Sequence, residues 1–131
     1  YLDANIPNQI ETVVDYKDVS EPLDLRVRSY VDINCAHCHR LNSHCDYRPM
    51  RYAFSESNLS QNMGICVTPD ENISSILTYI VSPNNKTKSV MHHRMNTTDE
   101  AIRMPIVGRT MIHKEGVDLI EQWINSLPPC N

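Results

Sequence analysis

The chain has 131 residues, a length typical of a single domain. Hydrophobic residues make up 40% of it, and with only 3 glycines it is neither collagen-like nor a flexible linker. Its 12 lysines and arginines against 16 aspartates and glutamates give a net charge of -4, which argues against a nucleic-acid-binding protein. The longest apolar run, at residues 76–81, is too short to form a transmembrane segment.

The first part of the chain contains an irregular segment followed by a helix. Residues 1–19 show no sustained hydrophobic period, and we interpret them as an N-terminal strap or linker. In residues 20–34 apolar side chains recur at helical spacing, which predicts a helix with a suitable N-cap at Ser20. This helix leads directly into Cys35. We expect residues 20–131 to form the folded domain.

The middle of the chain is poor in regular structure. Residues 42–70 are polar and irregular, which is typical of a long loop that wraps something or is held by a crosslink. Residues 73–81 fit two interpretations. Thr68 and Glu71 have the spacing of a capping box and favour a helix, whereas the β-branched residues of this segment favour an extended chain.

Two further helices are predicted in the second half. Residues 86–95 form a short helix with Met91 and Met95 on its apolar face, and residues 96–110 form a loop. Residues 117–127 carry a clear apolar stripe that ends at a Pro-Pro pair. The fold class is therefore mostly α. The long loops leave little regular core for this length, which raises the question of what fills the interior.

The most informative motif is Cys-Ala-His-Cys-His at residues 35–39, which has the C-x-x-C-H pattern of c-type haem attachment. The thiols of Cys35 and Cys38 are spaced to join the two vinyl groups of one porphyrin, and His39 follows as the iron ligand. A zinc site and a redox dithiol are the alternatives. Zinc sites usually have a second paired cluster of ligands, which this sequence lacks. A thioredoxin-like dithiol lies in a βαβ unit, and the sequence shows no such unit.

The second axial ligand decides the role of such a haem. Electron-transfer cytochromes c commonly use a methionine. Among six methionines, Met104 is favoured because Pro105 holds it extended in an irregular loop, from which its side chain can project. The remaining candidates are other methionines and four histidines, His44, His92, His93 and His113.

The segment RVRSYVDINCAHCH at residues 26–39 resembles the RARAYLDVNCAHCH segment of exported bacterial c-type cytochromes. Residues 93–99 and 103–110 (RMPIVGRT) are similar to the distal loop of the same family, and residues 113–124 are similar to the start of its last helix. Together these three blocks extend over residues 19–127. After the motif, the chain departs from the Gly-rich sequence that is common in the family.

The resemblance implies a cytochrome c-like fold with long loops around one covalently bound haem c, and axial ligation by His39 and Met104. It implies an extended segment at residues 76–81 rather than a helix. It also implies a periplasmic or otherwise exported protein, in which this domain often closes a longer chain. The expected function is single-electron transfer, without catalysis by the polypeptide.

Three cysteines remain after haem attachment. We expect a disulfide between Cys45 and Cys66, which would contribute about 3 kcal/mol by closing the long loop. The alternatives are a buried, free Cys66, or a bridge from Cys66 to Cys130, which otherwise is a free thiol near the chain end. Arg109 follows the ligand loop and is expected either to bind a haem propionate or to lie in solvent. His113 has the same role or caps the last helix.

Other functions remain open from the sequence. One is a haem-based sensor or haem enzyme in which Met104 is displaceable, and another is a structural module held by its haem. The expected partner is a redox protein with a basic or neutral surface, or another domain of the parent chain. No Ser-His-Asp set, H-E-x-x-H motif or phosphate loop indicates a separate active site.

Overall fold

A computed structural model describes residues 11–131, and this part of the chain contains three α-helices and one short 3-10 helix. The helix α1 spans Leu23–Asn34, α2 spans Val90–Met95, and α3 spans Lys114–Ser126, while the 3-10 helix η1 at Lys86–Lys88 precedes α2. Only isolated β-bridges occur among the described residues. The prediction of a small, mostly α protein with long loops is therefore confirmed.

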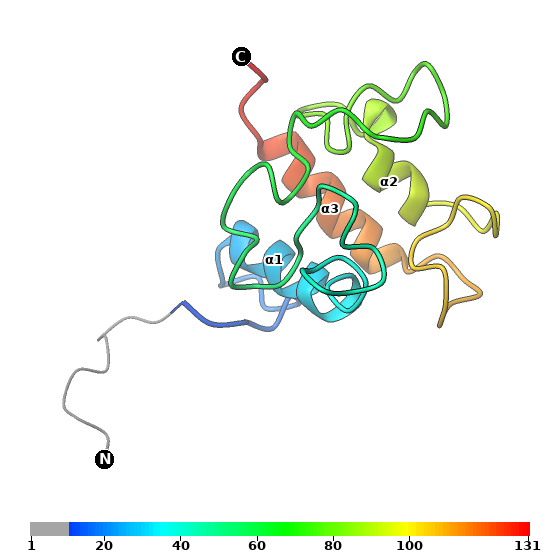
Figure 1. Ribbon diagram of the computed structural model, residues 1–131. Helices are drawn as coiled ribbons and strands as arrows, with labels where there is room; N and C mark the ends of the chain where they lie inside the picture. The colour runs from blue at the N-terminus through cyan, green and yellow to red at the C-terminus, as the bar shows by residue number, and fades with distance from the viewer. Residues whose placement is uncertain (1–10) are drawn as a thin grey trace.

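The helix α3 lies at the centre of the arrangement, and α1 and α2 both pack against it (Figure 1). Long connections fill the remaining space. The segment after α1, coloured cyan to green, runs across the face of the helices, and the loop between α2 and α3 projects from the side of the molecule in yellow and orange (Figure 1). The loops therefore make up much of the wall around the interior.

The core forms where α1 and α3 meet. Trp123 of α3 is 2% exposed, and its apolar neighbours on both helices are equally enclosed. Gly116 is required in this contact, because a Cβ atom at this position would overlap the Tyr30 hydroxyl of α1. The other fully enclosed apolar residues of the two helices are Val27, Val31, Ile120 and Ile124.

The start of α1 differs from the prediction. The helix begins at Leu23, and Pro22 occupies the N-cap without a side-chain cap. Ser20 was expected to cap the helix, but its hydroxyl donates instead to the carboxylate of Asp18 at 2.6 Å. Pro22 suits this boundary because its ring fixes φ in the range that a helix start needs and its missing N–H is not required there.

The segment before α1 lies along that helix. The Val14 amide donates to the Ser29 hydroxyl at 2.9 Å, and the guanidinium of Arg28 contacts the Glu11 carboxylate at 2.8 Å. Residues 11–19 of the expected strap or linker therefore contact the folded domain. The rest of that segment, residues 1–10, lies outside the described residues.

Residues 79–81 are extended and join the long loop to α2. Two parallel bridges, Ile65 to Val81 and Tyr79 to Ser89, place this short segment between residues 64–67 and the start of α2. The capping-box helix at residues 73–81 does not form. The β-branched side chains thus prevail over the capping pattern. The extended interpretation of residues 76–81 is confirmed at residues 79–81, where the bridges form, whereas Ile76 lies in a turn.

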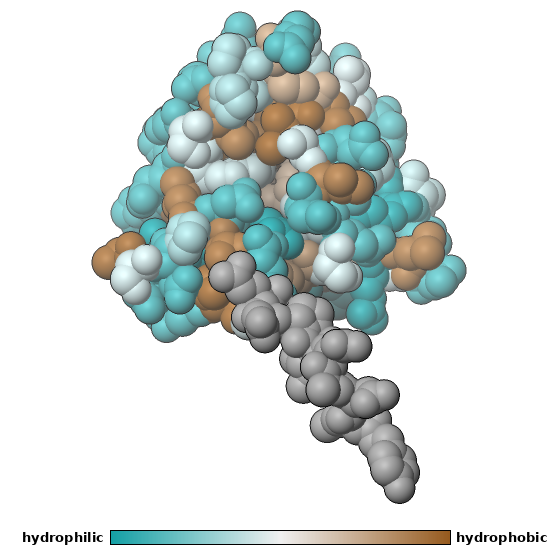
Figure 2. Space-filling model, turned by 90° about the vertical axis from the view of Figure 1, so that its left-hand side faces the viewer, coloured by the Kyte–Doolittle hydropathy of each residue, from teal (hydrophilic) through white to brown (hydrophobic). Residues whose placement is uncertain are grey.

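The surface is mixed in character. The face shown in Figure 2 is largely hydrophilic, with hydrophobic residues gathered in patches between polar ones. Within residues 11–131, no helix combines the length and the apolar composition needed to cross a bilayer.

Candidate haem-binding cavity

The C-x-x-C-H motif forms a tight turn at the end of α1. The Cys35 amide donates to the Val31 carbonyl at 2.8 Å and so closes the helix. The carbonyl of Cys35 then accepts hydrogen bonds from the amides of Cys38 at 3.1 Å and His39 at 2.9 Å. The helix end therefore fixes the backbone of all three motif residues relative to one another.

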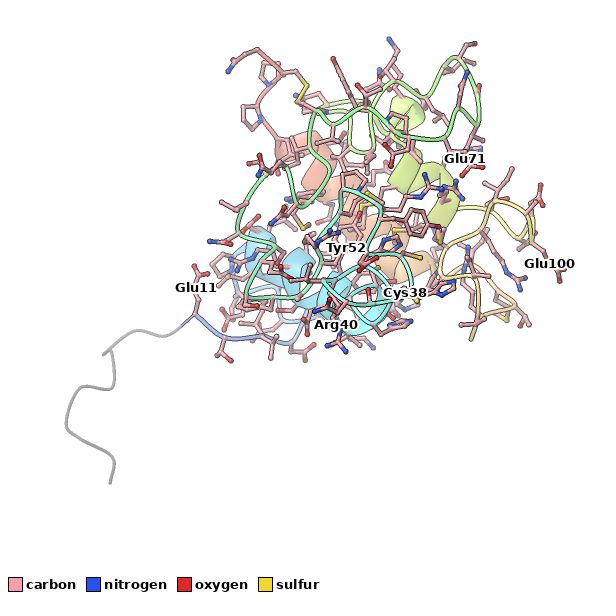
Figure 3. All side chains as sticks on the ribbon, in the orientation of Figure 1. Glu11, Cys38, Arg40, Tyr52, Glu71 and Glu100 are labelled. Atoms are coloured by element: carbon pink, nitrogen blue, oxygen red, sulfur yellow. A yellow bond between two sulfur atoms is a disulfide. The ribbon has the colours of Figure 1, made fainter. Side chains whose placement is uncertain are left out.

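These residues line a cavity of about 430 Å³. Cys35, Cys38 and His39 contribute to its wall, and so do Met104 and Arg109 from the loop between α2 and α3. In Figure 3, Cys38 lies toward the centre of the molecule, whereas Glu11 and Glu100 lie at its outer edges. The fold thus brings together every residue that the sequence analysis assigned to haem binding.

His39 is held firmly from one side. Its carbonyl accepts a hydrogen bond from the Tyr52 amide at 2.8 Å, and the two rings meet edge to face with 5.5 Å between centroids. Burial, followed by the nearby Arg48 and His37, lowers the pKa of His39 below its ordinary range. The imidazole is therefore neutral at neutral pH, which is the state that binds metal ions.

The ring of His39 also has unused hydrogen-bonding capacity. Its Nδ1 atom is buried and has no partner among the described residues. An imidazole that binds a metal through one nitrogen usually donates its other N–H to a carbonyl, carboxylate or water.

The Cys35 thiol is held in its neutral form. Burial, with a smaller contribution from Cys38, raises the pKa of Cys35 to about 12. Neither Cys35 nor Cys38 is in a disulfide. The third free cysteine, Cys45, is buried, lines the same cavity, and donates its amide to the Cys38 carbonyl at 2.9 Å.

Several thioethers face the same space. Met104 is half-buried, and its amide donates to the Arg94 carbonyl at 2.9 Å, which ties its loop to α2. Met91 and Met95 are buried, as predicted for core positions, but they also form part of the cavity wall. Met50 lines the cavity too, whereas the exposed Met111 does not.

The four candidate histidines divide into two pairs. His44 and His113 line the candidate haem-binding cavity, whereas His92 and His93 line a separate groove on α2. His113 occupies the N-cap position of α3 without a side-chain capping hydrogen bond, and its Nδ1 lies 2.8 Å from the Tyr30 hydroxyl. The structure therefore places His92 and His93 away from the space that a distal ligand would share with Met104.

Arg109 holds the Met104 loop together. Its guanidinium donates to the carbonyls of Thr97 at 2.8 Å, Arg94 at 3.1 Å and Met111 at 3.1 Å. Its Nε is buried and has no partner among the described residues. Arg109 is thus a loop clamp as well as a lining residue, and its contact with a haem propionate remains a prediction.

A network of charged side chains lies at another part of the cavity wall. The Glu71 carboxylate contacts Arg94 at 3.1 Å and Arg48 at 3.5 Å. Asp70 is 3.6 Å from Arg48. The acidic pair therefore joins the long loop, which carries Arg48, to α2, which carries Arg94.

The disulfide prediction was wrong in its pairing. Cys66 bonds to Cys130, with 5.9 Å between their Cα atoms, and Cys45 is free. The Cys45 amide donates to the Cys38 carbonyl, which holds Cys45 in the turn after the motif. The Cys66 amide donates instead to the Val81 carbonyl, at another part of the long loop. The chain after α3 is thereby anchored to the long loop, so Cys130 is not a free thiol.

Some residues of the cavity had no signal in the sequence. Tyr52 and Glu71 are single residues in an irregular loop, and only the fold brings them beside His39 and Arg94. Among the described residues, no group of three or more His, Cys, Asp and Glu side chains is placed to hold a metal ion.

Comparison with protein-family models, with curated proteins and with solved structures found no match to this chain.

Proposed function

We propose that this protein binds one haem c covalently and transfers single electrons. The observation that carries the proposal is that Cys35, Cys38, His39 and Met104 line one cavity, although Met104 is far from the motif in sequence. Two thiols, a neutral imidazole and a thioether are the groups that a low-spin c-type haem requires.

The cavity also suits the size and polarity of a porphyrin. Its volume of about 430 Å³ falls within the range of small-molecule and cofactor sites. Apolar side chains such as Ile80, Val90 and Met91 line it, and they match the apolar face of the ring. Arg109, with an unpaired Nε, supplies a charged donor for a carboxylate.

Each of these residues would have a separate role in binding the haem. Cys35 and Cys38 would hold the haem by thioether bonds, and His39 and Met104 would occupy both axial positions. When bound, the haem supplies an iron that alternates between the ferric and ferrous states. Tyr52 orients His39, and Arg109 orients the Met104 loop. A thioether ligand and a buried environment both favour the reduced iron and raise the reduction potential.

The proposed location is the periplasm or another exported compartment. The disulfide between Cys66 and Cys130 supports this proposal, because structural disulfides persist mainly in oxidising compartments. The proposed partner is a redox protein or another domain of a parent chain. Because the net charge is -4, a basic or neutral docking surface on the partner would be favoured.

A second candidate function is a haem-based sensor or haem enzyme in which the distal ligand is displaced. One observation favours it, since Met104 lies on residues 96–113, which contain no helix or strand. Such a loop can move at lower cost than a packed helix. Carbon monoxide binding to the reduced protein separates the two functions, because electron transfer needs no open position on the iron.

Visible spectra of the oxidised and reduced protein test the proposal. Met104→Ala is expected to lose the thioether-to-ferric charge-transfer band, and His39→Ala to lose the low-spin spectrum. Met111→Ala is the matched control, because Met111 is 75% exposed and does not line the cavity. An unchanged spectrum in Met104→Ala would contradict the assignment and move the ligand to Met91 or Met95.

A further inference from the structure

A second cavity lies on the opposite side of α2 from the haem-binding cavity. It is a groove of about 490 Å³ between η1, α2 and α3, and polar and charged side chains form most of its wall. Of its lining residues, only Val117 also lines the haem-binding cavity. The groove therefore needs an explanation of its own.

His92 is the unusual residue of this groove. It is 8% exposed, and its Nε2 is buried without a hydrogen-bond partner among the described residues. The nearest carboxylate oxygen is Glu121 Oε2 of α3, at 3.7 Å. This separation is too long for a hydrogen bond, so a buried polar atom is left unsatisfied, which is rare in native proteins.

The protonation states of the pair suit metal binding. Burial is the main effect on His92 and lowers its pKa, although Glu121 acts in the opposite direction. A hydrogen bond from Lys86 lowers the pKa of Glu121. At neutral pH the groove therefore presents a neutral imidazole beside an ionised carboxylate, the two forms that coordinate metal ions.

We propose that His92 Nε2 and the Glu121 carboxylate bind one divalent transition-metal ion of the Zn²⁺ type. One imidazole nitrogen and one carboxylate oxygen, each at its usual bond length to a tetrahedral Zn²⁺, lie about 3.4 Å from each other. The observed 3.7 Å is within a few tenths of an ångström of that value. A small rotation of the Glu121 side chain, which is 31% exposed, would close the difference.

The remaining coordination positions would be filled by water and by Asn96. No third His, Cys, Asp or Glu of the described residues is placed to complete the site. Asn96, the C-cap residue of α2, lines the groove one helical turn after His92, and we propose its side-chain oxygen as the further ligand. The site is thus open to solvent on one side.

The ammonium group of Lys86 competes with the metal ion for the Glu121 carboxylate. This group contacts Glu121 Oε1 at 2.6 Å and would repel an incoming cation. The ion would displace this contact and link α2 to α3 in its place. Because α2 carries Met91 and Met95 of the haem-binding cavity, the ion would brace one wall of that cavity from behind.

Calorimetric titration of the purified, tag-free full chain with ZnCl₂ at neutral pH tests the proposal. The wild type is expected to bind one Zn²⁺, and Glu121→Gln and His92→Gln are each expected to weaken binding at least tenfold. Lys86→Met is expected to strengthen it several-fold, which a purely structural ion pair would not do. His93→Gln, which changes an exposed neighbour in the same groove, is expected to bind like the wild type.

Three results would overturn the proposal. They are no Zn²⁺ binding by the wild type, unchanged affinity in Glu121→Gln, or loss of binding in His93→Gln. Glu121 and Lys86 are partly exposed, so their variants decide the matter even if His92→Gln fails to fold. Free thiols of Cys35 and Cys38 would themselves bind Zn²⁺, so a protein that proves to lack haem is titrated as the Cys35→Ser/Cys38→Ser variant. The outcome for His92 and Glu121 is then separate from that of the proposed function.

Discussion

Tyr52 holds His39 through both its backbone and its ring. The Tyr52 amide donates to the His39 carbonyl at 2.8 Å, and the Tyr52 ring lies edge to face against the imidazole, with 5.5 Å between centroids. These contacts restrict the main chain and the side chain of His39 together. A residue of an irregular loop thus positions the proposed axial ligand.

Replacement of the ring should therefore destabilise the protein. Tyr52 is 4% exposed, so Tyr52→Ala is expected to lower the free energy of unfolding by about 3–5 kcal/mol. Tyr52→Phe keeps the ring and is expected to cost less than about 1.5 kcal/mol. Urea unfolding of the two variants measures the difference, and equal losses would show that the ring contact with His39 contributes little.

The disulfide between Cys66 and Cys130 should be a major source of stability. It joins residues separated by 64 positions, and the loss of chain entropy in the unfolded state gives about 4 kcal/mol for a loop of this size. Cys130→Ser is expected to lower the free energy of unfolding by about that amount. Cys45→Ser tests the alternative pairing of Cys45 with Cys66. If that pairing were correct, the variant would lose the disulfide and expose the thiol of Cys66.

Thiol titration of the denatured protein checks the cysteine assignment directly. With Cys35 and Cys38 in thioethers, one free thiol is expected before reduction, from Cys45, and three after it. Three before reduction and five after it would mean that the haem is not attached.

Arg109 should control the distal ligand through its loop. Its guanidinium joins the carbonyls of Arg94, Thr97 and Met111, and Arg109→Ala removes all three contacts. We expect this variant to weaken the thioether charge-transfer band and to bind carbon monoxide more readily when reduced. Arg40→Ala, at an exposed position next to the motif, is the control. Identical spectra for the two variants would be evidence against a clamp.

Much of this arrangement follows from patterns that are local in sequence. The helical stripe before Cys35 and the stripe around Trp123 predicted α1 and α3, because each buries one face against the other. The C-x-x-C-H motif and Met104 were predicted to meet, and both line one cavity. Short motifs whose chemistry requires particular residues at fixed spacing can therefore be identified from the sequence before the fold is known.

The contacts that depend on loop paths were not predictable in this way. Cys66 had two possible partners, and the choice of Cys130 over Cys45 depends on where the chain runs after α3. The same holds for Tyr52, which has no periodic pattern around it. The predicted start of α1 was wrong for a different reason. Ser20 is a good capping residue, but its hydroxyl donates to the Asp18 carboxylate instead of capping the helix.

Stability should fall as the pH decreases from 7 to 5. Burial lowers the pKa of His92 below its ordinary value of 6.5, so in this range the unfolded chain takes up a proton that the folded protein does not. The stabilisation is complete above pH 6.5 and is lost as the pH falls. Urea midpoints should show this slope. His92→Gln should reduce it but not abolish it, because burial also lowers the pKa of His39, whereas His93→Gln should leave it unchanged. A midpoint that stays constant or rises toward pH 5 would contradict the assignment.

Covalent haem attachment through Cys35 and Cys38 is the claim on which the proposed function depends. The intact mass of the denatured protein, purified from cells able to attach haem c, measures it most directly. The expected mass is that of the polypeptide plus one haem, and Cys35→Ser/Cys38→Ser should show the polypeptide alone. A wild-type protein that is colourless and has only the mass of its amino acids would contradict the proposal.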